Sequence, residues 1–327
     1  MRHFKRTYFY IISIICILIM GIVFYQVYTS KDNASVSVNS SVIRLVCVYS
    51  GTSDYYKASL EKGLKKAARE HNIWVDFISL KQYETDKHST ELDKAIASKV
   101  DGIITNIPDS KIVSQYIEKA SGCNIPVILI ESDLPNSGRL SFVGTNSYAY
   151  GLTAAKLLPK SSQKIKIANF KNADIDKYNL KNLGFRNALP GGMETEMFVV
   201  NENSVIEYTN MAQSIFLEHS DINSFFCTDA ESTIGVVRAM IEFNKTDSLV
   251  IGAGDTEEIV EYIKNGLLYA SLVEDSYSIG YLAVNCIFNH INGENISDSI
   301  NPEIIVITKD NVDKVINERK DKSYNEK

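Results

Sequence analysis

From residue 43 onward, the chain alternates between two patterns of hydrophobic positions. Short apolar runs rich in Val, Ile, Leu and Phe predict buried strands. The stretches between them repeat apolar residues at helical spacing, as Leu60, Leu64, Ala67 and Ala68 do, which predicts amphipathic helices. Strands that alternate with such helices are typical of parallel sheets covered on both faces.

The alternating pattern runs twice along the chain. The first set of expected strands covers residues 43–49, 74–80, 100–106 and 125–131. The second covers residues 164–170, 194–200, 222–228, 248–254 and 269–274. Helices are expected between them, over residues 89–99, 110–120, 177–189, 206–219, 233–244 and 257–265. A late helix over 277–290 and a strand over 303–308 follow the second sheet, so we expect the chain to cross back between two lobes.

The N-terminus has a different pattern. Residues 7–28 are almost uninterruptedly apolar, which is long enough to cross a bilayer as a helix. A cleavable signal peptide would have a shorter apolar region and a site of small residues behind it, and residues 24–28 offer no such site. We therefore favour an uncleaved anchor, followed by a polar tether over residues 30–41. The basic residues before the apolar run place the globular part outside the cytoplasm.

Composition excludes several classes of function. The 327 residues carry a net charge of −6, and no basic cluster lies outside the first six residues and a charged C-terminal tail over 317–327, so nucleic-acid binding is not expected. The histidines are isolated and no CxxC is present, so neither a metal site nor a catalytic site is predicted. The run GAGDTE resembles a dinucleotide loop, but Glu257 replaces its third glycine and would repel a pyrophosphate. We expect no cofactor and no enzymatic activity.

Eight ordered motifs carry a resemblance to a known family. They read GLKKAARE, VDGIITNIPDS, NIPVILIESD, VGTNSYAYGLTAA, LGFRNAL, FFCTDAESTIGVVRAM, VIGAGDTEEI and DSYSIGYLAVN. From about residue 43 to the last strand, the chain resembles the type I periplasmic binding proteins, the sugar-binding group that also supplies the ligand domains of LacI-type repressors. The apolar N-terminus stands where a repressor has its helix-turn-helix, which argues against DNA binding.

The resemblance implies an α/β fold: two Rossmann-like lobes with parallel sheets, joined by hinge crossovers, that close on one small molecule, usually a monosaccharide. The expected divisions are an anchor and tether over 1–41, an N-terminal lobe over 42–145 plus 276–302, and a C-terminal lobe and tail over 146–275 plus 303–327.

The resemblance also implies a ligand site at the ends of the strands. Sugars are bound by carboxylates, amides and cations that pair with hydroxyls, and by aromatic rings that cover C–H faces. The matching positions in this sequence are Ser53, Tyr55, Tyr56, Glu131, Ser132, Asn146, Lys181, Asp229, Asp255 and Glu274. At least one of the two tyrosines is expected to contact ligand. Tyr55 is favoured, because Tyr56 lies four residues before Leu60 and can pack in the helix core.

Two positions depart from the family pattern. Ser132 and Lys181 stand where an arginine is usual, and a lysine keeps the charge but loses bidentate geometry. Other interpretations of the site residues stay open. Lys181 can be a solvated helix lysine, and Asn146 or any of the acids can be a helix cap.

The predicted function is that of a membrane-tethered, extracytoplasmic, non-catalytic monosaccharide-binding protein for a ribose- or xylose-like sugar. Its partner is a membrane sensor kinase or an ABC permease. The uncleaved anchor favours the kinase, because it resembles the arrangement of xylose-responsive binding proteins that pair with LytS-type kinases. Four predicted acids against Lys181 as the only cation also leave an amino sugar or another cationic solute as an alternative ligand.

Overall fold

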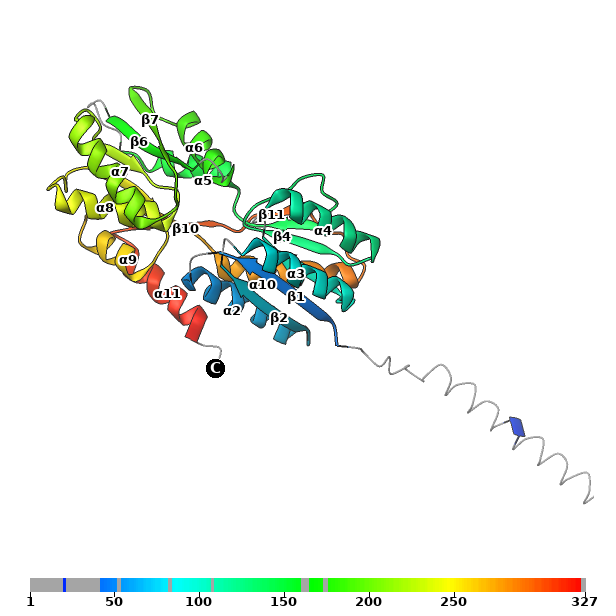
Figure 1. Ribbon diagram of the computed structural model, residues 1–327. Helices are drawn as coiled ribbons and strands as arrows, with labels where there is room; N and C mark the ends of the chain where they lie inside the picture. The colour runs from blue at the N-terminus through cyan, green and yellow to red at the C-terminus, as the bar shows by residue number, and fades with distance from the viewer. Residues whose placement is uncertain are drawn as a thin grey trace, which may run out of the picture. The chain divides into compact units, whose positions relative to one another are not determined.

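The computed structural model describes residues 20–21, 42–51, 54–81, 84–106, 109–159, 165–172 and 176–324 (Figure 1). The predicted anchor and tether lie outside the described residues, apart from Met20 and Gly21. Within the described part of the chain, no helix combines the length and apolar character needed to cross a bilayer. Arg44–Lys327 forms one compact unit.

Two six-stranded sheets form the core of the folded unit. In sheet A all strands run parallel, in the order β11–β5–β4–β3–β1–β2. These strands are β1 (Arg44–Ser50), β2 (Trp74–Leu80), β3 (Gly102–Thr105), β4 (Val127–Ile130), β5 (Ser141–Val143) and β11 (Ser299–Ile300).

Sheet B repeats this plan in the order β12–β10–β9–β8–β6–β7, with β12 antiparallel to β10. Its strands are β6 (Ile165–Asn172), β7 (Met193–Val200), β8 (Ser224–Phe226), β9 (Leu249–Ala253), β10 (Ala270–Glu274) and β12 (Ile304–Thr308). In each sheet, the strand that comes first in the chain (β1 or β6) lies between two strands that come later. Ligands of open α/β sheets bind beyond the carboxyl ends of the strands at such a switch point in the strand order.

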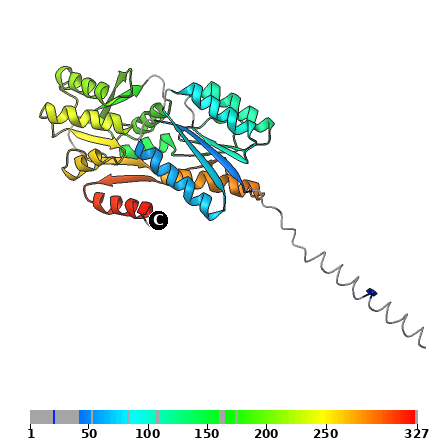
Figure 2. The same cartoon turned by 60° about the horizontal axis from the view of Figure 1, so that its bottom comes forward.

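Helices cover both faces of each sheet. In the N-terminal lobe, α2 (Asp54–Glu70) and α10 (Ser276–Ile291) pack together on sheet A, and α3 (Thr85–Ala97) and α4 (Ser110–Gly122) pack together as a second pair. Figure 2 shows α10 in orange beside α2 in blue. In the C-terminal lobe the helices are α5 (Ser147–Lys156), α6 (Asp176–Asn187), α7 (Val205–Glu218), α8 (Ala230–Glu242), α9 (Glu257–Lys264) and α11 (Val312–Tyr324).

The chain passes between the two lobes at three places: from β5 to α5, from β10 to α10, and from β11 to β12. These crossings bring α10 back onto sheet A and β12 back onto sheet B. The predicted fold class of two α/β lobes with parallel sheets and crossovers is confirmed.

The structure differs from the sequence prediction in several elements. Helix α3 begins at Thr85, four residues before the expected start. Strands β5 and β11 were not expected, because three and two residues are too few to show a strand pattern. The predicted C-terminal tail is wrong over residues 317–324, which belong to helix α11.

Glycines allow two pairs of helices to pack very closely. A Cβ atom on Gly280 of α10 would lie 2.3 Å from the carbonyl oxygen of Leu60 in α2, and one on Gly63 would lie 2.0 Å from that of Tyr277. Helices α5 and α6 pack equally closely, because a Cβ on Gly151 would lie 2.0 Å from the carbonyl oxygen of Lys181. Backbone atoms form these contacts, so a side chain cannot simply rotate away.

We predict that Gly280→Ala lowers the free energy of unfolding by about 2–3 kcal/mol, because the added methyl forces α10 away from α2. Gly122→Ala in α4 is the matched control. A Cβ there meets nothing within 4 Å, so alanine should leave stability unchanged or raise it by up to about 1 kcal/mol. Urea unfolding of both variants measures the difference, and equal stabilities would contradict the close-packing explanation.

Candidate functional site

A cleft of about 640 Å³ lies between the two sheets, within the range of roughly 300–1,000 Å³ that is usual for ligand sites. Its walls come from the carboxyl ends of parallel strands in both lobes. The polar residues at these ends are Ser50 at the end of β1, Asn106 after β3, Glu131 after β4, Asn146 after β5, Asp229 after β8, Asp255 after β9 and Glu274 at the end of β10. Donors and acceptors from two separate sheets therefore converge on one space.

Glu131 organises the wall of the N-terminal lobe. Its Oε1 accepts a hydrogen bond of 2.9 Å from the hydroxyl of Tyr49, and its Oε2 one of 3.4 Å from Nδ2 of Asn106. Glu131 also adopts a left-handed backbone conformation, with φ of 63°, which costs a residue with a Cβ about 1–2 kcal/mol. Strained residues of this kind are concentrated at functional sites, where the surrounding structure holds them in place.

An aromatic pair lies beside Glu131. The ring of Tyr56 stacks on that of Tyr49, with centroids 5.7 Å apart, and both side chains line the cleft. Burial, together with the nearby charge of Glu131, raises the pKa of Tyr56 well above its usual value. Tyr56 is therefore a neutral phenol at physiological pH, with a ring at the wall of the cleft.

Lys181 is the central cation of the C-terminal lobe. It is only 3% exposed, so the alternative of a solvated helix lysine is wrong. Its Nζ donates to Oε1 of Glu274 at 2.7 Å and to the carbonyl oxygen of Thr228 at 3.1 Å, and lies 4.1 Å from the ring centroid of Tyr150. Lys181 thus compensates the charge of Glu274 at the wall of the cleft.

Helix capping separates the remaining predicted residues into two groups. Asn146 caps α5 through Oδ1, which accepts from the backbone N–H of Ala149, and Asp229 caps α8 in the same way through Ser232. Asp255 and Glu274 have no such role, because their neighbours Thr256 and Asp275 cap α9 and α10. The capping alternative therefore holds for Asn146 and Asp229 and is wrong for the other two.

The predicted site residues come together in this cleft where the structure describes them. Those that line it are Tyr56, Glu131, Ser132, Asn146, Lys181, Asp229, Asp255 and Glu274. Ser53 and the side chain of Tyr55 lie outside the described residues. Contact between these side chains and a ligand remains a prediction.

Among the cleft residues that sequence reasoning missed are Tyr49, Asn106 and Arg319. Asn106 is the polar residue that ends the third apolar run, and this position could have identified it as a cleft residue. Arg319 lies in residues 317–327, which were expected to form a charged tail. Its signal was the spacing from Val312 and Ile316, which places all three residues on one face of a helix.

A buried histidine supports the strand ends that form the N-terminal wall of the cleft. His88 is completely buried, with Nδ1 2.6 Å from Oγ of Ser50 and Nε2 2.8 Å from Oγ1 of Thr105. The hydroxyl of Thr105 donates to the carbonyl oxygen of Val48, so it must accept from Nε2–H of His88. Nδ1 then accepts from Ser50, and the neutral tautomer satisfies both contacts.

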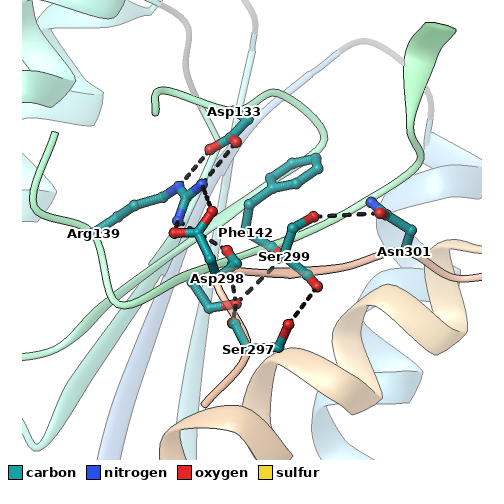
Figure 3. A network of polar contacts seen from close by, with 8 residues as sticks. Asp133, Arg139, Phe142, Ser297, Asp298, Ser299 and Asn301 are labelled. Carbon is teal, nitrogen blue, oxygen red and sulfur yellow. Dashed lines mark hydrogen bonds and ion pairs between the residues drawn. The ribbon is translucent and has the colours of Figure 1, made fainter. Parts of the chain in front are cut away.

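Arg139 ties the loop that follows β4 to the third crossover (Figure 3). Its side chain is 2% exposed and forms ion pairs with Asp133, which lines the cleft, and with Asp298, 2.9 Å away at Oδ1. Asn301 adds a hydrogen bond of 2.8 Å from Nδ2 to the carbonyl oxygen of Gly144, in the first crossover. These contacts join the loop between β4 and β5 to Asp298, next to β11, and the first crossover to the third.

Comparisons with known proteins match this architecture. A family model described as a periplasmic binding protein domain matches residues 45–295. The ribose import binding protein RbsB of Bacillus subtilis (strain 168) is 22% identical over 256 residues, which cover 77% of this chain and 82% of that protein.

Two solved structures share the fold. GanP, a glucose-galactose binding protein from Geobacillus stearothermophilus, has a TM-score of 0.76 at 28% identity, and the match covers 83% of this chain and 99% of GanP. The XylFII–LytSN complex contains a chain with a TM-score of 0.72 at 26% identity, with 82% of this chain and 98% of that chain covered.

We predict that His88 makes stability depend on pH. Burial lowers the pKa of His88 from 6.5 to about 4. Between these values the unfolded chain binds a proton that the folded chain does not, so the free energy of unfolding falls as the pH decreases from 6.5 to 4. The loss at pH 4 relative to pH 7 is on the order of 3 kcal/mol.

His88→Gln removes this titration and keeps an N–H donor for Thr105. Urea unfolding between pH 4 and pH 7 should give a shallower pH dependence for the variant than for the unsubstituted chain. Parallel curves would show that His88 does not contribute.

Proposed function

Because the chain belongs to the periplasmic binding protein domain family, we propose that its cleft binds a monosaccharide outside the cytoplasm, without catalysis. The observation that carries this proposal is the convergence of carboxylate, amide, hydroxyl and ammonium groups from two sheets on one cleft with an aromatic wall. Adjacent sugar hydroxyls both donate and accept, so a mixed set of partners matches them. The resemblance in the sequence motifs to type I periplasmic binding proteins is confirmed by the family match.

The roles of the individual residues follow from their surroundings. Glu131 presents a carboxylate held by Tyr49 and Asn106, which we assign to accept hydrogen bonds from sugar hydroxyls. Lys181 is held at Glu274 and we assign it as a donor. Tyr56 offers a ring for the C–H face of the sugar. We also retain Ser53 and Tyr55 as ligand contacts.

The pairing of two of the predicted acids with cations weakens the case for an amino sugar or another cation as the ligand. In the sequence, four acids faced one cation. In the structure, Glu274 pairs with Lys181, and Oδ2 of Asp255 lies 3.0 Å from Nε of Arg319. An acid that already has a cationic partner attracts a cationic ligand less strongly.

We propose that binding closes the two lobes about the three crossovers. The proposed boundaries of the lobes are residues 42–145 plus 276–302 and residues 146–275 plus 303–327. A ligand that contacts both walls binds the closed form better and shifts the population toward it.

Titration calorimetry of the full-length protein in detergent tests the ligand class. With a panel of pentoses, hexoses and D-glucosamine, we predict tight binding of at least one neutral aldose, with a dissociation constant on the order of 1 μM or lower, about −8 kcal/mol. The same panel with Glu131→Gln should show weaker binding. Binding of D-glucosamine alone would assign the cleft to a cationic solute, and no binding of any sugar would refute the proposal.

We further propose that an N-terminal membrane anchor holds the protein on the cell surface and that the sugar-bound form signals to a membrane histidine kinase. The 26% identity to a chain of the XylFII–LytSN complex supports this role. The similarity to a ribose import binding protein supports the alternative, delivery of sugar to an ABC permease.

Gene deletion separates the two roles. We predict that deletion abolishes transcription induced by the sugar and leaves uptake of the radiolabelled sugar intact. Re-expression of the full chain provides the control. Lost uptake with intact induction would assign the protein to transport.

A further inference from the structure

The last helix of the chain carries an arginine to the wall of the cleft. Val312 begins α11 and is 2% exposed, and Val315 and Ile316 pack against the core of the C-terminal lobe. Arg319 follows Val312 by seven residues, so it lies on the same face of the helix. Figure 1 shows α11 in red beside α9. The matched part of the family model ends at residue 295, so α11 lies outside it.

Arg319 meets Asp255 at the cleft. The side chains are 12% and 5% exposed, and both residues line the cleft. Gly254, at a φ of 90°, precedes Asp255, and Thr256 rather than Asp255 caps the next helix. The carboxylate of Asp255 is thus available for pairing at the cleft wall.

A second observation concerns Nη1, another nitrogen of the guanidinium group of Arg319. Nη1 of Arg319 is buried and hydrogen-bonds to no atom of the residues that the structure describes. A buried donor without an acceptor costs on the order of 1–3 kcal/mol, and more when it is charged. A helix fastened to the core only for stability would not need an arginine placed in this way. The side chain of Arg319 is partly exposed at the cleft, so a small rotation of the guanidinium group toward an acceptor in the cleft removes the penalty.

We propose that Arg319 is a ligand-binding residue that acts as a pair with Asp255. The guanidinium group of Arg319 donates to one oxygen of the sugar, and the carboxylate of Asp255 accepts from a neighbouring hydroxyl. Because Arg319 also compensates the charge of Asp255, the pair selects neutral sugars against amino sugars. This inference rests on the proposed function, that the cleft takes a monosaccharide.

Calorimetry of full-length variants tests the proposal, with the tightest-binding aldose of the panel and D-glucosamine as probes. Arg319→Gln should weaken aldose binding by about 10- to 100-fold, the loss of a charge-assisted hydrogen bond. It should also raise the affinity for D-glucosamine relative to the aldose by about 10-fold, because Asp255 loses its cation. Arg319→Lys keeps the charge and should restore the preference for the aldose.

Lys314→Ala is the matched control. Lys314 is a cation of the same helix, 77% exposed and 3.9 Å from Glu318, so its removal should leave both affinities within about 2-fold. Melting temperatures without ligand separate binding from folding. A purely structural role would lower the melting temperature of Arg319→Gln and leave the ratio of the two affinities unchanged.

The outcomes separate this inference from the proposed function. If the unsubstituted chain binds an aldose and Arg319→Gln binds both probes with the same affinity ratio, the inference is wrong and the proposed function stands. If the unsubstituted chain binds no sugar, both are wrong. Should Arg319→Gln fail to fold, unchanged aldose affinity in Arg319→Lys would overturn the inference, because the lysine lacks the planar guanidinium group.

Discussion

The parallel direction of the strands is the constraint on which the site depends. Parallel strands end at one edge of a sheet, so the residues that follow β1, β3, β4 and β5 gather in one place. Sheet B repeats the order and supplies a second edge. Three crossovers between the sheets, rather than one linker, hold the two edges on either side of a common cleft.

Charge compensation determines what such a cleft can accept. Acids at strand ends are available to hydroxyls, but a set of uncompensated carboxylates would favour cations. In this chain, Lys181 from α6 and Arg319 from α11 pair with Glu274 and Asp255. Arg139 does the same for Asp133 in the lining of the cleft, and thereby joins the loop that follows β4 to Asp298, next to β11. The three pairs reduce the negative charge of the cleft, whose lining also contains Glu131, Asp229 and Glu231.

Much of the site could be predicted from sequence because strand ends are local features. Glu131, Asp229 and Asp255 each follow an apolar run, so their placement at the cleft depended only on recognising parallel strands. The predictions failed where the relevant contact joins distant segments. Strand β11 has two residues and forms because it pairs with β5, so no local sequence pattern predicts it. The segment with Arg319 carries helical spacing, but its charged composition resembles that of a solvated tail.

By itself, the sequence determined the number of sheets, the alternation of strands and helices, and the residues at the strand ends, because these depend on periodicity within a few residues. The tertiary structure alone decided which charges are paired. Lys181 meets Glu274 across 93 residues, and Arg139 meets Asp298 across 159. Such pairs form only in the folded chain, because an ionic contact requires two charges within a few ångströms of each other in three dimensions. This kind of contact leaves no periodic pattern along the sequence.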